Sequence, residues 1–584
     1  MAPRELPKVV RVLPDVAGIR REFDYAIPQT LSDDGRAAEA AVGSMVRIQL
    51  HGRRVAGWIT ALDPEPEPNI ELRPLAKISG IGPPAELIEL ARWAAHRWVG
   101  PTASLLGTAS PQKMVSRLAA MVHGTPQPMP DVDLVRLAFS GDGSVVRVPP
   151  LGDRWPLILG AVAQGNALIL VPSLAQAGTV SSRLNKRGVT TAVYPGDWAR
   201  GAAGATVVGA RSAALAPVAG LAAVLMVDEH DDVYQEERSP TWHAREVIVE
   251  RARRAGVPCV LTSPIPTPEA TAALPSLAPG RHEERAGWPL VRVVDPREDS
   301  AGRGTLWSAP VVRALRGIGR VGCVVNRKGR SRLLSCVACD ELAVCTECDS
   351  ALRQDDEAEF VCAGLGHRRP VVCSACGGTA FKNLRIGVSR AREELEVLLR
   401  EPVVEVTADR DDSGASGSRV FVGTEAMLHR VSGLETVVFA DFDQELVAPR
   451  FRAAEQAMAL IIRAGRLVGG RRSGSGEVVL QTRQPGHPVV RAAVAADVEH
   501  WCSAIVARRE LLRYPPYGAL AEISGAAAAE FMQRLGRPPG VQVQGPVKGA
   551  WLARAPDPAT LAEALNSVER PKGRLRIAVD PLRL

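Results

Sequence analysis

Residues 336–376 read CVACDELAVCTECDSALRQDDEAEFVCAGLGHRRPVVCSAC and hold seven of the ten cysteines of the chain. They form three Cys-x-x-Cys pairs with one further cysteine before the last pair: Cys336 and Cys339, Cys345 and Cys348, Cys362, and Cys373 and Cys376. Two cysteines at this spacing can reach one metal ion from a tight turn, and a tetrahedral zinc site needs two such pairs. The stretch therefore predicts two zinc ions in a small module that folds around them.

Length and composition indicate several ordinary soluble domains. A chain of 584 residues exceeds the usual domain length several times, and its 46% hydrophobic and 23% charged residues are typical of globular proteins. No apolar run approaches the roughly 18 residues of a membrane span, and the first residues lack the apolar segment of a signal peptide. We therefore expect a cytoplasmic protein whose clustered thiols bind metal, with disulfides as the weaker interpretation.

The net charge says little about partners. A formal charge of +7 and a pI near 9.0 mildly favour an anionic partner. Only eight of the 71 basic residues are Lys, and a GC-rich coding bias explains such an excess of Arg better than nucleic-acid recognition does.

Hydrophobic patterns divide the chain into regions. Alternating apolar and polar residues predict a β-rich domain over 1–80, as in GSMVRIQL at 43–50. Helical spacing predicts a helical module over 81–135, where Leu87, Leu90, Trp93, Ala94 and Trp98 share one helix side.

Two series of short apolar runs follow, and they predict parallel α/β sheets. The first series, with runs such as ALILVP and LAAVLMVDEH, covers 145–290; the second, with VGCVVNR and TVVFADFD, covers 291–334 and 381–485. The cysteine module, 335–380, is inserted into the second series, and an α+β domain is predicted over 486–584.

Short motifs along nearly the whole chain resemble the PriA family of bacterial replication restart proteins. The resemblance rests on their order and spacing: FDYAIP at 23–28, VGSMVRI at 42–48, GARSAAL at 209–215, EHDDVYQ at 229–235, WHARE at 242–246, NRKG at 326–329, the cysteine module, VGTEAML at 422–428, RYPPYG at 513–518 and VDPL at 579–582. It implies two RecA-like helicase lobes in the α/β regions, a winged-helix-like module over 81–135 and a DNA-binding domain over 1–80.

In that family the first domain binds the 3′ end of a nascent strand in a pocket shaped by a Phe-Asp-Tyr motif. The motif falls here on Phe23, Asp24 and Tyr25, while Gly43 and Arg73 fall near other pocket positions. A ring can stack on a terminal base, a carboxylate can accept from a free 3′ hydroxyl, and Arg73 could meet phosphate. From spacing alone, Phe23 and Tyr25 fit strand core residues with Asp24 facing water.

The phosphate loop of a family helicase is missing. Such a loop supplies glycines, a Lys for the β and γ phosphates and a Ser or Thr for magnesium. The corresponding stretch reads Gly152-Asp153-Arg154-Trp155, with no Lys and no hydroxyl. An aspartate there would repel phosphate, and a tryptophan would crowd the space that phosphates need.

The other nucleotide motifs are altered too. The family's Asp-Glu-Glu-His is Val227-Asp228-Glu229-His230, although a one-residue shift would restore an Asp-Glu pair. The third motif is LTSPIP at 261–266, the Lys-Gly-His motif is LHRVS at 428–432, and the arginine-finger motif is reduced to an Ala-Gly-Arg step ending at Arg466. We therefore expect no ATP hydrolysis, with Asp228 and Glu229 as remnants of the site.

The resemblance also assigns the zinc ligands. In the family the outer two cysteine pairs share one ion and the inner two pairs share the other. The first ion would be held by Cys336, Cys339, Cys373 and Cys376; the second by Cys345, Cys348, Cys362 and His367, which would replace a cysteine expected at Leu365. The alternative for His367 is a solvent-facing side chain beside Arg368 and Arg369. Neither site leaves a position for water, so both ions would be structural.

The resemblance implies a helicase-like protein that binds forked and single-stranded DNA and recruits the replicative helicase and its loader. It also implies single-strand binding protein as a partner, a nucleoid location in the cytoplasm and no membrane association. Arg327, Lys328, Arg471 and Arg472 are candidate phosphate contacts, although exposed basic pairs are more often solvated surface. One alternative is an active ATP-dependent 3′-to-5′ DNA helicase with a divergent nucleotide site; another is a zinc-bearing interaction protein that does not touch DNA.

Overall fold

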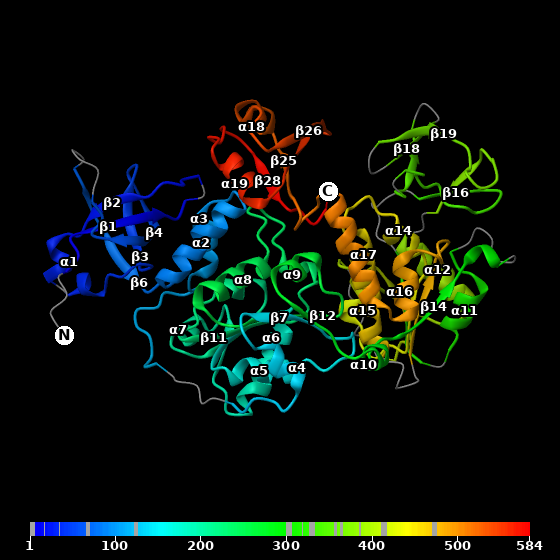
Figure 1. The fold of residues 1–584 in the computed structure, drawn as a ribbon, viewed down its shortest axis with the longest axis horizontal. Helices are drawn as coiled ribbons and strands as arrows, with labels where there is room; N and C mark the ends of the chain where they lie inside the picture. Colours follow the sequence, from blue (N-terminus) through cyan, green and yellow to red (C-terminus); the bar gives the residue numbers. More distant parts are fainter. Residues whose placement is uncertain are drawn as a thin grey trace. The chain divides into compact units, whose positions relative to one another are not determined.

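The computed structural model groups the chain into two compact units (Figure 1). It describes residues 6–583 apart from 17, 34, 66–70, 122–126, 300–305, 318, 326–332, 348, 356–358, 363–365, 385–386, 410–416 and 470–475. The first unit comprises Met1–Arg147, Arg154–Leu277 and Val506–Leu582; the second comprises Val148–Asp153, Ala278–Ile505 and Arg583–Leu584.

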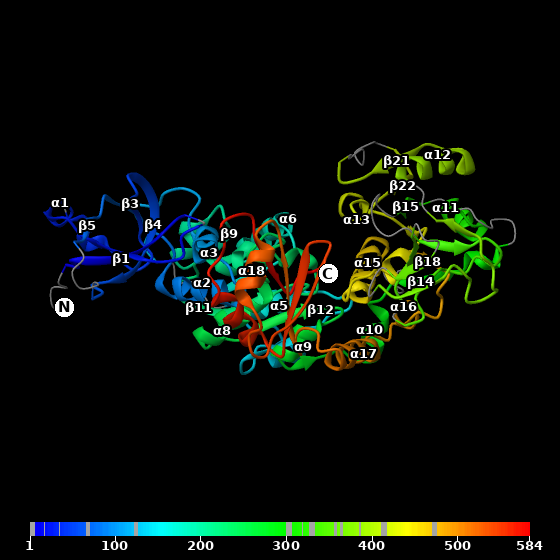
Figure 2. The ribbon, with the colours of Figure 1, turned by 90° about the horizontal axis from the view of Figure 1, so that it is seen from above.

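The first unit begins with a six-stranded sheet in the order β5-β2-β1-β4-β3-β6. Its strands are β1 (Val9–Pro14), β2 (Phe23–Ala26), β3 (Met45–Leu50), β4 (Arg53–Leu62), β5 (Arg73–Pro74) and β6 (Lys77–Gly80), and α1 (Gln29–Asp33) follows β2 in the chain. Figure 2 labels α1 with β1, β3, β4 and β5. Alternate side chains such as Val10, Val46 and Ile48 form its core, as the alternating pattern predicts. The turn between β3 and β4 has positive φ at His51 and Gly52.

Two helices cover part of this sheet: α2 (Ala85–Arg97) and α3 (Thr102–Ala109). Trp58 of β4 packs into the same core as Leu87 and Trp98, and its indole N–H donates to Ser110 Oγ at 2.8 Å. Trp93 packs against this core while partly exposed. In the described part of 81–121 we find no strand, so the wing of a winged helix stays a prediction.

A seven-stranded parallel sheet follows, in the order β13-β7-β12-β11-β8-β10-β9. Its strands are β7 (Gly143–Arg147), β8 (Asn166–Leu170), β9 (Thr191–Tyr194), β10 (Thr206–Gly209), β11 (Leu221–Met226), β12 (Cys259–Ser263) and β13 (Ser276–Leu277). The helices are α4 (Asp133–Ala138), α5 (Trp155–Ala163), α6 (Leu174–Asn185), α7 (Trp198–Ala202), α8 (Ala244–Ala255) and α9 (Pro268–Ala273). Because β7, β12 and β11 are neighbours, the segments that follow them meet at one edge.

The second unit contains a six-stranded parallel sheet in the order β14-β24-β23-β15-β22-β21. Its strands are β14 (Leu290–Val294), β15 (Val321–Val324), β21 (Val403–Val406), β22 (Val420–Gly423), β23 (Thr436–Phe439) and β24 (Glu477–Gln481). Its helices are α10 (Arg281–Ala286), α11 (Ala309–Leu315), α12 (Val388–Leu399), α13 (Met427–Arg430), α14 (Asp443–Leu446), α15 (Ala453–Val468) and α16 (Pro488–Ala495). The sequence placed α16 in the C-terminal domain, whereas the second unit continues to Ile505.

The cysteine module lies between β15 and α12. It consists of short antiparallel strands: β16 (Leu334–Cys336) pairs with β20 (Phe381–Asn383), and β18 (Glu359–Cys362) lies between β17 (Leu352–Gln354) and β19 (Arg368–Pro370). Its apolar core contains few residues, among them Phe360 and Leu352 beside Cys345 and Cys362. A core of this size is typical of modules that depend on metal ions.

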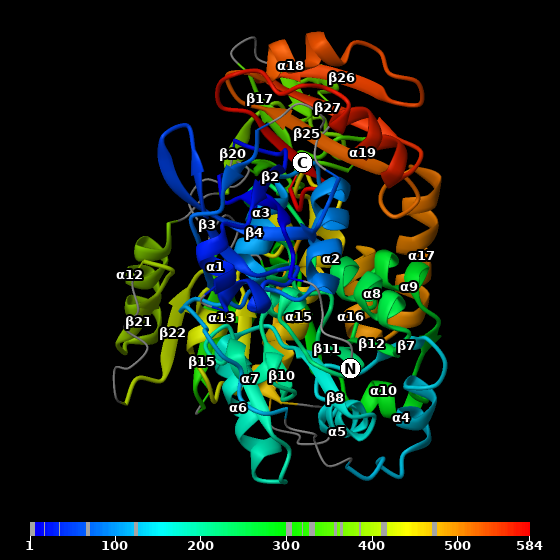
Figure 3. The same ribbon diagram turned by 90° about the vertical axis from the view of Figure 1, so that its left-hand side faces the viewer.

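The chain ends in an antiparallel sheet of four strands in the first unit, reached through α17 (Val498–Leu511). The order is β26 (Gln542–Val547), β27 (Ala550–Ala555), β25 (Ala519–Ser524) and β28 (Arg576–Val579), with α18 (Ala528–Leu535) and α19 (Pro558–Asn566) packed nearby (Figure 3). Asp580 accepts from Arg97 of α2 at 2.7 Å. No helix of the described residues is long and apolar enough to span a membrane.

Candidate functional site

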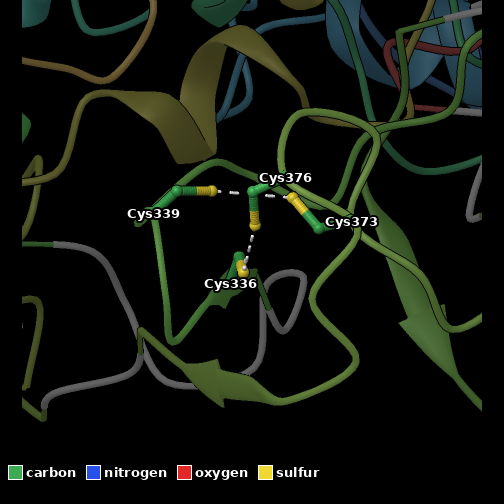
Figure 4. A group of neighbouring side chains, drawn as sticks. All are labelled: Cys336, Cys339, Cys373 and Cys376. Carbon is green, nitrogen blue, oxygen red and sulfur yellow. Dashed lines mark hydrogen bonds between the residues drawn. The ribbon is translucent and has the colours of Figure 1, made fainter.

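The first predicted zinc site is assembled in the structure (Figure 4). Cys336, Cys339, Cys373 and Cys376 bring their sulfurs within 4.8 Å of one another. The distances from Cys336 to Cys376 and from Cys339 to Cys373 are both 3.6 Å between sulfurs. Tetrahedral zinc with bonds of about 2.3 Å places its sulfurs about 3.8 Å apart. The four side chains therefore fit one zinc ion.

The pKa values of two of these thiols, Cys336 and Cys339, are shifted in opposite directions. Burial opposes ionisation of Cys336, but the backbone N–H groups of Cys339 and Ala338 outweigh it and lower the pKa of this thiol to about 7. The backbone N–H of Glu341 favours the Cys339 thiolate, yet burial and the neighbouring sulfurs raise its pKa to about 12. The cluster therefore needs a divalent ion before all four sulfurs can be thiolates.

The second predicted site brings Cys345, Cys362 and His367 within 4.8 Å of one another. His367 Nδ1 lies 3.3 Å from Cys345 Sγ, and its carbonyl accepts from the Cys362 backbone N–H at 2.7 Å. The loop from Cys362 thus turns back and presents the imidazole to the two sulfurs. Cys348 and Leu365 lie outside the described residues. Three of the four predicted ligands therefore fit a metal ion.

Two acidic residues directly after Cys339 attach this module to the parallel sheet of the second unit. Asp340 accepts from Arg483 Nε at 3.1 Å, and Arg483 also donates to Asp443 at 3.2 Å. Glu341 accepts from Arg297 at 2.6 Å. Arg483 follows β24 and Arg297 follows β14, so the zinc turn is held at the carboxyl ends of two strands. No motif or spacing in the sequence indicates these contacts.

The residues at the predicted nucleotide motifs contact other side chains of the protein. Arg154, immediately before α5, lies with Nε 3.3 Å from Asp228 Oδ1, and the Asp228 side chain is 5% exposed. Asp228 has a φ of 58° and its backbone N–H donates to Thr262 Oγ1. Asp228, the first of the two acidic residues of the motif, therefore faces an internal guanidinium.

Glu229 is also engaged internally. Its carboxylate is fully buried and accepts from Arg245 at 2.9 Å, from the Thr267 hydroxyl at 2.8 Å and from the Thr267 backbone N–H at 2.8 Å. Burial raises the pKa of this carboxyl, although Arg245 and Thr267 favour its ionised form. A carboxylate with these partners stabilises the helix start at α9 and is not directed at water.

Aromatic and arginine side chains fill the start of α5. The Trp155 ring is 9% exposed, and the Arg183 guanidinium lies 3.8 Å from its centroid. In the second unit, Arg466 donates to the Pro150 carbonyl at 3.2 Å. The residues at the phosphate-loop and finger positions thus make internal contacts.

The residues predicted to meet a 3′ end lie on two neighbouring strands. Tyr25 is buried in the sheet core and donates to the Gln49 carbonyl at 3.2 Å, while Phe23 packs at the edge of this core. Asp24 points to the other face and accepts from Arg11 at 2.8 and 3.0 Å. Tyr25 lies opposite Arg73 of β5, which is exposed.

Backbone conformation and packing both require glycine at position 43. Its φ is +94°, and an added Cβ would lie 1.7 Å from the Pro83 carbonyl oxygen. The close approach joins β3 to the segment before α2. Tyr25 donates to Gln49, which lies near the turn that contains Gly52. A Cβ added at Gly52 would meet no atom within 4 Å, so this turn is open where the surroundings of Gly43 are tight. Arg327, Lys328, Arg471 and Arg472 lie outside the described residues.

Solved structures match this chain only at low similarity. The structure of yeast Dbp5 bound to RNA and ADP BeF3 matches with a TM-score of 0.35 and 12% identity, over 64% of this chain and 93% of the Dbp5 chain. The DUF1998 helicase MrfA bound to DNA and AMPPNP matches with a TM-score of 0.36 and 13% identity, over 66% of this chain and 54% of the other. Scores this low say nothing about function.

Sequence relatives are more informative. Residues 11–111 match the family model for the PriA 3′DNA-binding domain (3′BD). A probable replication restart protein PriA of Mycobacterium leprae is 27% identical over 97% of this chain and 92% of its own length. PriA of Bacillus subtilis is 28% identical over 54% of this chain and 43% of its length, and PriA of Treponema pallidum is 31% identical over 53% and 50%. Over nearly its whole length the chain is thus similar to proteins named replication restart protein PriA, and residues 11–111 match the 3′ DNA-binding domain of that family.

Proposed function

We propose that this protein binds fork-shaped DNA in replication restart and recruits the replicative helicase and its loader without hydrolysing ATP. The observation that carries the second half of this proposal is the ion pair between Arg154 and Asp228. The family relationship supports the first half, because the region 11–111 matches a 3′ DNA-binding domain.

Hydrolysis of ATP needs a phosphate cradle, a metal ligand and a carboxylate that positions water, all acting on one γ-phosphate. At this edge the sequence offers neither Lys nor hydroxyl before α5. Asp228 is neutralised by Arg154, and Glu229 is enclosed by Arg245 and Thr267. Magnesium would have to displace a guanidinium from a buried carboxylate. In this proposal the two parallel sheets are therefore inactive helicase-like lobes.

The DNA side of the proposal rests on the first domain. A terminal base could stack on Phe23, whose ring is only partly buried, and Arg73 is exposed for a phosphate. Asp24 keeps oxygen lone pairs beside its bonds from Arg11 and could accept from a 3′ hydroxyl. The two zinc ions would be structural, and we expect single-strand binding protein as a further partner at the nucleoid.

A second candidate is an active ATP-dependent 3′-to-5′ DNA helicase. The acidic pair Asp228-Glu229 after β11 favours it, because this is where a metal ligand and a catalytic carboxylate would lie. It would require Arg154 to leave Asp228 when nucleotide binds.

Equilibrium binding of the full-length, zinc-loaded protein tests the proposal. Forks with a free 3′ hydroxyl at the nascent end, forks with a 3′ phosphate there and plain duplex would be compared. We expect the free 3′ end to bind most tightly, and Asp24→Asn to reduce this preference. Equal weak binding to all three substrates would instead support a zinc-bearing interaction protein that does not touch DNA.

A further inference from the structure

Three basic side chains share one exposed face of the N-terminal sheet: Arg47 on β3, Arg54 on β4 and Lys77 on β6. Arg47 lies directly opposite Lys77, and Arg54 lies opposite Gln49, two residues along the same face from Arg47. The intervening residues Val46 and Ile48 point into the core on the other face. We call these three basic residues the cationic strip.

The strip carries uncompensated positive charge. Like charges directly opposite one another on antiparallel strands destabilise a sheet. Among the described residues, no carboxylate lies within ion-pair distance of Arg47, Arg54 or Lys77. Burial raises the pKa of the Asp15 carboxyl group, and Arg47 is close enough for its charge to oppose this rise, but the two side chains form no ion pair. The three cations of the strip therefore have no ion-pair partner among the described residues, an arrangement that costs stability unless an anion binds.

The dimensions of the strip suit a phosphate backbone. Neighbouring strands lie about 4.8 Å apart, so the strip spans about 10 Å across β6, β3 and β4. The phosphates of one DNA strand advance about 3.4 Å each along the helix axis, so this width covers about three of them. Strands β3 and β6 are at the opposite edge of the sheet from β2 and β5, which carry Phe23 and Arg73. The strip and the 3′-end residues could therefore contact different parts of one substrate.

We propose that the cationic strip binds the phosphate backbone of a duplex arm of the fork. This inference rests on the proposed function and adds a second contact to it, one that does not read the 3′ end. It predicts that the strip contributes affinity and salt dependence, whereas the residues on β2 and β5 contribute the preference for a free 3′ hydroxyl.

The test compares full-length wild type with R47Q/R54Q/K77Q on forks with a free or a phosphorylated 3′ end, between 50 and 200 mM salt. We expect the triple variant to lose at least about tenfold in affinity at low salt for both forks, with an unchanged ratio between them. Each lost phosphate contact should reduce the salt slope by about 0.9, so the slope should fall by about two to three.

The control is K186Q/R200Q/R285Q, which removes three exposed cations elsewhere and should change affinity and slope much less. The strip variant should unfold at no lower temperature than wild type, because the opposed charges are gone. If wild type binds forks and the strip variant has unchanged affinity and salt slope, the proposal that the strip binds a duplex arm is overturned, while the proposed function stands. Failure of wild type to bind any fork would overturn the strip and the proposed function together.

Discussion

The guanidinium of Arg154 lies against the carboxylate of Asp228, with 3.3 Å between Nε and Oδ1, at the carboxyl end of β11. In nucleotide-hydrolysing proteins a carboxylate at the end of such a strand holds magnesium beside the phosphates. In the proposed function, Arg154 of the same chain takes the place of that cation. The pair is thus a buried contact within the first unit, in which the Asp228 side chain is 5% exposed.

Breaking this pair should therefore affect stability. Asp228→Asn leaves Arg154 beside a neutral, buried side chain, and we expect a loss of about 1–3 kcal/mol in the unfolding free energy of the first unit. Hydrogen exchange on β11 and α5 would measure it, with Arg154→Gln and the double variant completing a cycle. The more exposed pair Arg211 and Glu236 is the control, since Arg211→Gln should cost less than about 1 kcal/mol. A coupling free energy of about zero between Arg154 and Asp228 in this cycle would contradict the account.

The zinc stoichiometry should follow the two clusters. Metal analysis of the purified protein should give two zinc ions per chain, His367→Ala should remove one of them, and His367→Cys should restore it because a thiolate also binds zinc. Cys373→Ser should remove the other ion and leave the His367 site loaded. If His367→Ala retains both ions, the fourth ligand of the second site is another residue.

Docking of the zinc module should couple metal binding to the sheet of the second unit. Because Asp340 follows the ligand Cys339 and accepts from Arg483, Arg483→Gln should speed zinc loss to a chelator several-fold and raise hydrogen exchange in β16. Arg292→Gln is the matched control, because Arg292 pairs with Glu477 on the same sheet away from the module. Equal zinc release from both variants would show that the docking contact does not support the metal site.

The stability of the second unit should depend on pH through the titration of Asp441. Burial, and then the negative charge of Asp443, raise the pKa of Asp441 to about 7, against an opposing effect of Arg483. The folded state therefore holds a proton that the unfolded state releases near pH 4, so stability should fall as pH rises from about 4 to 7. Asp441→Asn should remove roughly 2 kcal/mol of this fall between pH 5 and 8.

Denaturation of wild type and Asp441→Asn at both pH values would check this, with Gln444→Ala as a control for the 2.6 Å bond that Gln444 donates to Asp441. A variant that loses the same stability as wild type between pH 5 and 8 would show that Asp441 does not titrate there.

The sequence predicted the parts of the fold that depend on local pattern. Buried parallel strands are continuous apolar runs, so β8, β11 and β12 were visible. The cysteine spacing predicted two metal ions, and the family resemblance divided the ligands into the two clusters that the structure assembles. The docking of Asp340 on Arg483 was not visible, because the two residues are 143 positions apart and ordinary charged residues carry no spacing signal. The family position of Gly43 suggested a DNA contact, which stays a prediction; the structure adds that a Cβ at this position would meet the Pro83 carbonyl. Close approaches of this kind depend on tertiary packing and leave no local pattern in the sequence.

Hydrolysis of ATP by the full-length, zinc-loaded protein saturated with a fork that has a free 3′ end tests the central claim most directly. We predict phosphate release equal to that of buffer, with no change on adding DNA and none in Asp228→Asn or Glu229→Gln. DNA-stimulated hydrolysis that disappears in either variant would contradict the claim and support an active motor.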